Sequence, residues 1–336
     1  MRVFELQGGF GLDHLVAAER DTPEPGPGQV RVRLEAASLN YRDLLMATGK
    51  YNPKQPLPLV PCSDGVGIID AVGPGVDRVR EGERVATMFC QGWIGGPPTR
   101  ERLRQTLGGP LDGTLAEHLV LDQDGVCAVP EYLTPVEAAT LPCAALTAWS
   151  ALVSYGGVKA GDTVLVQGTG GVSLFALQIA TALGARVIVT SSQDWKLERV
   201  RALGSWREIN YRTEPAWGRV AHEMTDGRGV DHVIEVGGAD TLAQSLRAVA
   251  IGGTISLIGV LSGVQTDVAL TSILMQNVRL QGILVGSRDR FEAMGRAFDT
   301  HEIRPLVDRI FPFDEAREAF AYLAAAHHVG KVCIEV

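Results

Sequence analysis

The sequence predicts an α/β protein with two domains: a β-rich domain of short strands and a second domain whose parallel sheet is covered by helices. Two observations support this prediction. The chain has 336 residues, more than a single hydrophobic core usually organises. From about residue 135 onward, strand-like apolar runs alternate with segments of helical period, which is typical of a parallel sheet with helices on both faces. We place the first domain at residues 1–125 and the second at residues 126–285.

Short strands separated by turns account for the first domain. Gln29–Leu34 alternates polar and apolar residues after the turn Pro23–Gly28. Val66–Val72 is a short apolar run that ends before Gly73, and Arg84–Phe89 is another. Short strands with turn signals between them predict a compact β-rich domain.

The clearest element of the second domain is a strand followed by a helix. Thr163–Gln167 is a short apolar run, and in Val172–Leu183 the apolar residues recur at intervals of three and four up to a stop at Gly184. We expect further strands and helices in alternation, and a terminal strand, at these residues: 186–190, 194–203, 230–236, 240–250, 254–258, 291–300, 314–326 and 331–336.

Composition and charge exclude two classes of partner. The chain has 31 Lys and Arg against 39 Asp and Glu, a net charge of −8, and no basic stripe. Nucleic acids and anionic membrane surfaces require such a stripe, so we expect neither as a partner. Two uncharged stretches, residues 138–158 and 163–185, are long enough to span a bilayer. The first contains Pro142, the small residues Thr147 and Ser150 and the pair Gly156-Gly157, and the second contains glycines at its middle. We therefore expect buried strand–turn–helix units and no membrane association.

The five cysteines indicate a reducing compartment. They are odd in number and include no Cys-x-x-Cys pair, which argues against a disulfide framework and against a multi-cysteine zinc lobe. Met1–Leu6 has charges within its apolar stretch, unlike a signal peptide. We therefore expect a cytoplasmic protein.

A glycine-rich turn lies between the strand and the helix of the second domain. The turn and the start of the helix consist of Gly168, Thr169, Gly170, Gly171 and Val172. Gly168 permits a tight turn, Gly170 lets a pyrophosphate approach the backbone, and the start of the helix supplies unpaired N–H groups. Ser173 stands where glycine or alanine is usual. With a second strand ending about 20 residues later, the unit predicts a Rossmann dinucleotide site.

The end of that second strand distinguishes between the two nicotinamide cofactors. An acidic residue there would bind the ribose 2′-hydroxyl of NAD and repel a 2′-phosphate. The strand ends instead with Ser191 and Ser192, followed by Lys196, and Tyr211 ends the next strand-like run. Hydroxyl groups and an ammonium group suit a 2′-phosphate, so we predict NADP(H). NAD stays open because Asp194 lies nearby, and Lys196 alone would also fit a solvated helix face.

The order of these motifs is similar to that of a known superfamily. Val60–Gly67 and Gly73-x-Gly75-Val76 lie in the first domain, Gly168–Gly171 in the second, and Gly330-Lys331-Val332 near the end. The whole chain resembles the medium-chain dehydrogenase/reductase superfamily, and most of all its quinone-oxidoreductase-like and zinc-independent alcohol-dehydrogenase-like branch. The resemblance implies a GroES-like domain coupled to a Rossmann domain, hydride transfer with NADPH, and a homodimer. It also implies that residues 286–336 fold back onto the first domain.

The zinc-dependent members of that superfamily hold a catalytic metal with a Cys, a His and a later Cys. Matching their motifs to this chain puts Asn40 and Ser63 at the first two positions and Cys143 at the third. Amide and hydroxyl groups are poor zinc ligands, so we predict no metal site. A makeshift site of Cys62, Asp64 and Cys143 stays open as an alternative, as does an apolar role for Cys143.

Without a metal, hydrogen-bond donors have to stabilise the negative charge that develops on the substrate oxygen. The resemblance directs attention to Asn40, Tyr41 and Tyr51 as catalytic residues, through an amide N–H or a phenol O–H. The alternatives are structural: a turn for Asn40, packing for Tyr41 and a loop aromatic for Tyr51. The same resemblance assigns Lys331 to the cofactor phosphates, unless it is a surface lysine. It places these further residues near the nicotinamide: Thr147, Gly237, Gly259, Val260, Val285, Gly286 and Ser287.

The function that we expect is the NADPH-dependent, zinc-independent reduction of a small-molecule quinone, enone, aldehyde or ketone. Two alternatives stay open at this point. One is a zinc-containing alcohol dehydrogenase with atypical ligands, and the other is an NADPH-binding protein without turnover.

Overall fold

The computed structural model describes residues 1–336, and the chain forms two compact units. Unit 1 consists of Met1–Leu146 and Val285–Val336, and unit 2 of Thr147–Leu284. We predicted the first boundary at residue 125, but it follows residue 146. The segment after residue 125 stays in unit 1 because its strand β7 (Val126–Ala128) pairs with β5 (Arg84–Thr87).

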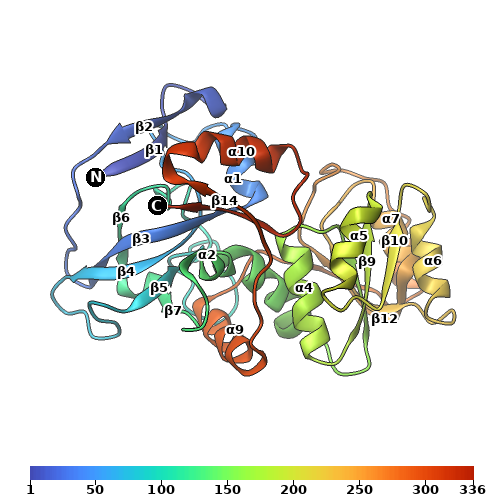
Figure 1. The fold of residues 1–336 in the computed structure, drawn as a ribbon. Helices are drawn as coiled ribbons and strands as arrows, with labels where there is room; N and C mark the ends of the chain where they lie inside the picture. Colours follow the sequence, from blue (N-terminus) through green and yellow to red (C-terminus); the bar gives the residue numbers. More distant parts are fainter. The chain divides into compact units, whose positions relative to one another are not determined.

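Unit 1 is built on a seven-stranded sheet in the order β14-β15-β3-β4-β5-β7, with β6 beside β3. Two of its strands come from the end of the chain, and Figure 1 shows this red segment beside the blue strand β3. β15 runs antiparallel to β3 with Val332 opposite Leu39, which brings the start of β15 to the end of β3. Its other strands, and the separate pair β1 and β2, have these bounds: β1 Arg2–Leu6, β2 Leu15–Glu19, β3 Gln29–Leu39, β4 Asp64–Val72, β6 His118–Asp122, β14 Val307–Pro312 and β15 Lys331–Glu335.

Three helices bury apolar faces in unit 1. α9 (Arg288–His301) buries Phe291, Met294 and Phe298, which recur at intervals of three and four. α10 (Ala316–Ala324) buries four residues in the same way, and α1 (Tyr41–Ala47) follows directly after β3. The start of α1 therefore lies beside the start of β15. Three 3₁₀ turns complete the unit: η1 Leu12–His14, η2 Gln123–Gly125 and η5 Phe313–Glu315.

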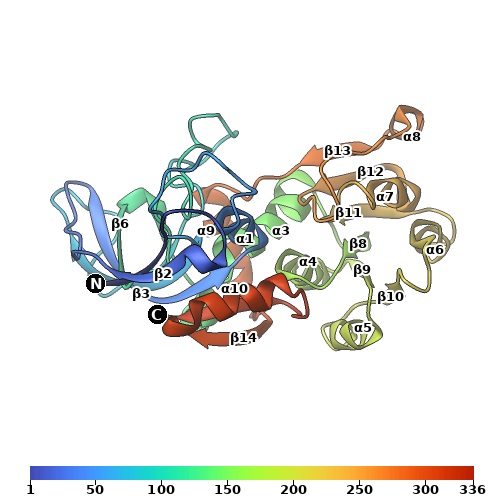
Figure 2. The same cartoon turned by 90° about the horizontal axis from the view of Figure 1, so that it is seen from above.

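Unit 2 is a six-stranded sheet in the order β10-β9-β8-β11-β12-β13, and every pair of neighbours is parallel. α4 and α5 pack against β8, β9 and β10, and Figure 2 shows α7 on the opposite side of the sheet. From β8 the chain adds β9 and β10 on one side, and it then continues with β11 on the other side of β8. Where the strand order reverses in this way, a crevice for ligands opens at the carboxyl ends of the strands. The bounds are β8 Thr163–Gln167, α4 Gly171–Ala182, β9 Arg186–Ser191, α5 Asp194–Arg201, β10 Arg207–Asn210, α6 Trp217–Glu223, β11 Val230–Glu235, α7 Leu242–Ala248, β12 Val249–Leu257, α8 Leu270–Leu274 and β13 Arg279–Gly282.

One long apolar helix corrects our expectation for the first uncharged stretch. Pro135–Tyr155 is continuous, with two π turns between and after its α-helical parts, rather than a strand, a turn and a helix. Pro142 is near the start of the first π turn, where its missing N–H costs little. This is the one helix long and apolar enough to cross a membrane, and 83% of its most apolar window is buried inside the protein. Its parts are α2 Pro135–Ala138, η3 Leu141–Ala145, α3 Leu146–Trp149 and η4 Ser150–Tyr155.

Candidate active site

Strand register places Lys331 beside Asn40, 291 positions away in the chain. The Lys331 ammonium donates to the Leu39 carbonyl (2.7 Å) and to the side-chain oxygen of Asn40 (2.5 Å). Only 4% of Lys331 is exposed, so the ammonium is enclosed by the protein and the alternative of a surface lysine is wrong. We predicted that Lys331 contacts the cofactor phosphates; the structure shows it in contact with a predicted catalytic residue.

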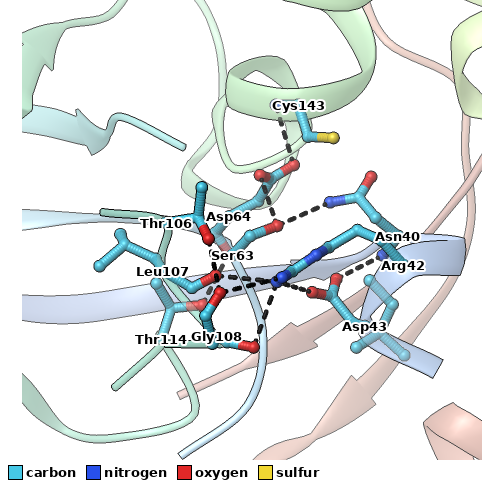
Figure 3. A network of polar contacts seen from close by, with 12 residues as sticks. Asn40, Arg42, Asp43, Ser63, Asp64, Thr106, Leu107, Gly108, Thr114 and Cys143 are labelled. Atoms are coloured by element: carbon cyan, nitrogen blue, oxygen red, sulfur yellow. Dashed lines mark hydrogen bonds and ion pairs between the residues drawn. The ribbon is translucent and has the colours of Figure 1, made fainter. Parts of the chain in front are cut away.

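Asn40, Ser63, Asp64 and Cys143 form a row of hydrogen-bonded groups (Figure 3). The Asn40 amide donates from Nδ2 to Ser63 Oγ (3.3 Å), and that hydroxyl donates to Asp64 Oδ1 (3.2 Å). The Cys143 backbone N–H donates to Asp64 Oδ2 (3.2 Å). The three positions matched to zinc ligands are therefore neighbours. We call these four residues together with Lys331 the Asn40 network.

Charged and aromatic groups of helix α1 and of the loop after it lie beside this network. The fully buried Asp43 carboxylate accepts from the Asn40 backbone N–H (2.8 Å) and lies 3.3 Å from the Arg42 guanidinium. Arg42 in turn lies 4.9 Å from the centre of the Tyr51 ring, which places Tyr51 beside the start of α1. Tyr41 and Tyr51 are 45% and 48% exposed, so packing does not account for either side chain.

Burial and charge set the protonation of the Asn40 network. Burial raises the pKa of the Asp64 carboxyl group to about 6, against the opposing effect of the Lys331 ammonium. Burial raises the pKa of Asp43 as well, against the effect of Arg42. The pKa of the Cys143 thiol lies well above its ordinary value because the group is buried and near Asp64. The network therefore contains a carboxyl group with a pKa close to neutral and, at neutral pH, a protonated thiol.

These groups do not fit a catalytic zinc ion. The oxygen of Asn40 already faces an ammonium, whose charge would repel a second cation. Cys143 would have to lose its proton to become a ligand, and its raised pKa makes that unfavourable. The alternative site of Cys62, Asp64 and Cys143 does not form, because no three His, Cys, Asp or Glu side chains lie close enough together to hold a metal.

The glycine-rich turn of unit 2 lies between β8 and α4 and fits a dinucleotide. Gly168 has a φ of +73°, a left-handed conformation that favours glycine. A side chain at Gly168 or Gly170 would meet no other atom within 4 Å, so open space for a pyrophosphate adjoins this backbone. No side chain caps α4 at Gly170, which leaves the first N–H groups of the helix for a phosphate. The Ser173 hydroxyl donates to the Gln167 carbonyl (2.6 Å) and so ties the helix to the strand.

Glu235 holds the neighbouring strand end, a role that we did not predict. It ends β11, is fully buried, and its carboxylate accepts five hydrogen bonds of 2.5–2.9 Å. The donors are the Gln167 side chain, the backbone N–H groups of Gly237 and Gly238, and the hydroxyls of Thr241 and Ser245. Because Gln167 precedes Gly168, this carboxylate joins the glycine-rich turn to the loop after β11.

The residues predicted for a 2′-phosphate lie at the ends of β9 and β10. Tyr211 donates its backbone N–H to the Ser191 carbonyl (3.0 Å), and its side chain is exposed. Lys196 is buried, so a solvated helix face does not describe it. Asp194, which left NAD open, accepts from the Asn210 amide (2.7 Å). Ser192 is half-buried next to Ser191.

The other predicted cofactor residues divide between the units. Gly237 and Gly259 flank Glu235 at the carboxyl edge of the sheet, since Gly259 donates its N–H to the Glu235 carbonyl (3.2 Å) and Val260 follows it. Thr147 is buried in α3, at the start of unit 2. Val285, Gly286 and Ser287 precede α9 in unit 1, and Val285 has a φ of +45°, which is strained for a β-branched residue.

Two features of these sites were missed in the sequence. Glu235 had a local signal: a carboxylate ends an apolar strand one residue before the pair Gly237 and Gly238. The contact between Lys331 and Asn40 has no local signal, because it depends on the register of two strands from opposite ends of the chain.

Comparison with known proteins identifies two family domains. An alcohol dehydrogenase GroES-like domain model matches residues 26–131, and a zinc-binding dehydrogenase model matches residues 171–300. The second match includes none of the positions 40, 63 and 143, so its description says nothing about the zinc ligands of this chain.

Whole proteins match over nearly the full chain. A zinc-type alcohol dehydrogenase-like protein of Schizosaccharomyces pombe is 44% identical over 97% of this chain and 96% of its own. Quinone oxidoreductase-like protein 2 of Bos taurus is 27% identical over 97% of this chain and 90% of its own. The structure of an NAD-dependent alcohol dehydrogenase is 35% identical, covers 100% of both chains and has a TM-score of 0.91. That of the crotonyl-CoA carboxylase/reductase AntE with NADP is 26% identical, covers 100% of this chain and 94% of its own, and has a TM-score of 0.90.

These matches confirm the predicted fold class, a Rossmann parallel sheet domain with a β-rich GroES-like domain. The relatives are alcohol dehydrogenases and quinone oxidoreductases, which are NAD(P)H-dependent oxidoreductases. The chain therefore belongs to the medium-chain dehydrogenase/reductase superfamily and is an oxidoreductase of its alcohol-dehydrogenase-like and quinone-oxidoreductase-like kind.

Proposed function

We propose that this protein reduces a small-molecule quinone, enone, aldehyde or ketone with NADPH and without a metal ion. The main support is the Asn40 network, in which an amide and a hydroxyl stand at two zinc-ligand positions and a buried ammonium adjoins the amide. The conjugated or simple carbonyl group is the substrate class that such uncharged donors can polarise.

The reaction needs a donor for the oxygen and a proton. When bound, the reduced nicotinamide supplies a hydride, which adds to a carbonyl carbon or to the β-carbon of a conjugated carbonyl compound. Asn40 stabilises the negative charge on the oxygen through its amide N–H groups, since it keeps part of its surface exposed while its amide is held by Ser63 and Lys331. The exposed phenol of Tyr51, beside α1, supplies the proton that completes the alcohol, the hydroquinone or, after hydride addition to a β-carbon, the saturated carbonyl compound.

Three observations support NADPH over NADH. The strand β9 ends in serines rather than an acid, Tyr211 lies beside Ser191, and Asp194 is engaged by Asn210. The related crotonyl-CoA carboxylase/reductase was solved with NADP, although another relative is an NAD-dependent enzyme.

We also propose that two copies associate through unit 2. Five large apolar side chains there are between 72% and 80% exposed: Ile251, Val264, Leu270, Leu274 and Met275. The adjacent β13 is the edge strand of its sheet and offers an unpaired row of N–H and C=O groups. An exposed apolar patch beside an open edge is typical of a protein interface, and a second copy of the same edge is self-complementary.

A substrate panel with metal analysis tests this function. We expect purified protein to oxidise NADPH in the presence of at least one quinone, enone or aldehyde, to contain no stoichiometric zinc, and to keep its activity in a chelator. Stoichiometric zinc with activity lost on chelation would indicate a zinc enzyme with atypical ligands instead. Tight NADPH binding without turnover of any substrate would indicate a non-catalytic binding protein.

Two substitutions in the same assay test the cofactor preference. Lys196→Ala and Tyr211→Ala should each weaken NADPH binding roughly tenfold or more, because a hydrogen bond to a charged phosphate is lost. NADH binding should change little. Lys159→Ala is the matched control, since Lys159 precedes the amino end of β8 and so lies at the opposite edge of the sheet. Equal weakening of both cofactors would contradict this assignment of the phosphate pocket.

A further inference from the structure

The Lys331 ammonium is held in place from several sides. The backbone N–H of Lys331 donates to the Leu306 carbonyl (2.9 Å), and its ammonium donates to Leu39 and Asn40. Gly330, just before it, has a φ of +93°, and a side chain there would come within 2.2 Å of the Leu306 carbonyl. This turn therefore requires glycine, and it directs the lysine into the unit instead of leaving it at the surface.

The ammonium determines how the Asn40 amide is oriented. An ammonium has three donors and no acceptor, so only the oxygen of the amide can face it. The NH₂ end of Asn40 must then face away from Lys331, where one N–H reaches Ser63. Ser63 and Asp64 are wholly enclosed, whereas Asn40 keeps 9% of its surface exposed. Among these three residues, the Asn40 amide is consequently the donor that can be offered to a ligand.

We propose that Lys331 is a positioning residue for the reduction: its ammonium locks the Asn40 amide with its NH₂ end toward the substrate oxygen and polarises it as a donor. This inference rests on the proposed function and deepens it. A cation bonded to the amide oxygen withdraws electron density from the N–H groups, and hydrogen bonds in such a chain strengthen one another. The role differs from binding the cofactor phosphates, which would act on cofactor affinity.

Steady-state kinetics of three variants test the inference. For Lys331→Met we expect kcat to fall roughly 10- to 100-fold, because an oxyanion donor is no longer held in position, while KM and Kd for NADPH stay within about twofold. Asn40→Ala should lose a similar factor. In the double variant the two losses should not multiply, because Lys331 acts through Asn40.

Asn40→Asp provides a test that does not depend on the folding of Lys331→Met. An aspartate keeps an oxygen for the ammonium and has no N–H groups, so the variant should fold and bind NADPH normally but lose activity as Asn40→Ala does. Lys331→Arg should recover part of the activity of Lys331→Met, since it restores a cationic donor. The control is Lys159→Met, which removes an exposed lysine of unit 2 and should leave kcat unchanged.

Chemical denaturation of the same variants tests the contact without turnover. The shift of the urea midpoint caused by Asn40→Ala should be at least about twofold smaller in the Lys331→Met background than in the wild type. Additive shifts would show that the two side chains do not interact and would overturn the inference.

The kinetic outcomes separate this inference from the proposed function. If the wild type reduces a substrate but Lys331→Met raises Kd for NADPH more than tenfold at constant kcat, Lys331 binds the cofactor and the inference fails alone. Wild-type kcat in Asn40→Asp would also overturn it. A wild-type protein that reduces no carbonyl compound would overturn the proposed function first, and this inference with it.

Discussion

Asp64 is an acid whose folded environment disfavours its charge. It is fully enclosed, and its carboxyl oxygens accept from Ser63, from the Cys143 backbone and from the Asn40 side chain. Lys331 lowers the pKa of this carboxyl group, but burial outweighs that effect and the pKa rises to about 6. The folded protein therefore binds the Asp64 proton more tightly than the unfolded chain does.

This raised pKa predicts a pH dependence of stability. The stabilisation from the protonated carboxyl group is fully present below about pH 4 and is lost as pH rises to about 6, roughly 3 kcal/mol in all. Asp64→Asn has no proton to lose at this position. Between pH 4 and pH 7 its free energy of unfolding should therefore rise relative to that of the wild type by about this amount. Urea unfolding at several pH values measures the difference. Asp13→Asn, which removes an exposed carboxylate, is the control, and a difference independent of pH for Asp64→Asn would contradict the argument.

At the scale of elements, Glu235 links the carboxyl ends of β8 and β11 through hydrogen bonds. Its carboxylate connects β8, through Gln167, to the loop after β11 and to α7, through Ser245. Five donors satisfy both oxygens of this buried side chain, and hydrogen bonds of this kind are strong. The glycine-rich turn thus derives its position from a group outside the turn.

Replacing one carboxylate oxygen tests this connection. Glu235→Gln turns an acceptor into a donor that faces N–H and O–H groups, so the free energy of unfolding should fall by about 2–4 kcal/mol. Dinucleotide affinity should fall with it, because the turn is held less firmly. Glu223→Gln, at an exposed ion pair with Arg219, should cost less than about 0.5 kcal/mol. Equal effects of the two substitutions in denaturant titrations would refute the role of Glu235.

Elements with a strong local pattern could be predicted from the sequence. β8 has the predicted bounds, and α4 starts one residue earlier than expected, because apolar spacing and a terminal glycine define both. β14 was missed because its pairing with β15 is not visible in its own residues. The helix Pro135–Tyr155 was missed because Pro142 and the small residues suggested breaks, whereas π turns absorb them.

Individual residues of the candidate site could be predicted from the sequence, but the contacts between them could not. Motif matching found Asn40, Ser63 and Cys143, and the structure joins them through Asp64. We predicted a cofactor contact for Lys331, the partner of Asn40, because a pairing between strands that are far apart in the chain leaves no periodic trace in the sequence.

For the whole molecule, the exposed apolar patch of unit 2 predicts an oligomer. Leu274→Glu and Met275→Glu together should convert a dimer to a monomer, since burying two carboxylates in an apolar interface is unfavourable. Light scattering coupled to size exclusion measures the mass. Ile94→Glu, which changes an exposed apolar residue of unit 1, should leave the mass unchanged. A monomeric wild type at micromolar concentration would exclude this interface.

The antiparallel pairing of β15 with β3 also has a consequence for synthesis on the ribosome. β3 leaves the exit tunnel early, but its neighbour β15 is translated only after the whole of unit 2. Unit 2 lies wholly between these two strands in the chain and is able to fold while the polypeptide is still tethered. Nascent chains that have not yet reached β15 should therefore contain a folded dinucleotide module with an incomplete partner module, and competence for turnover should appear only once β15 has left the tunnel.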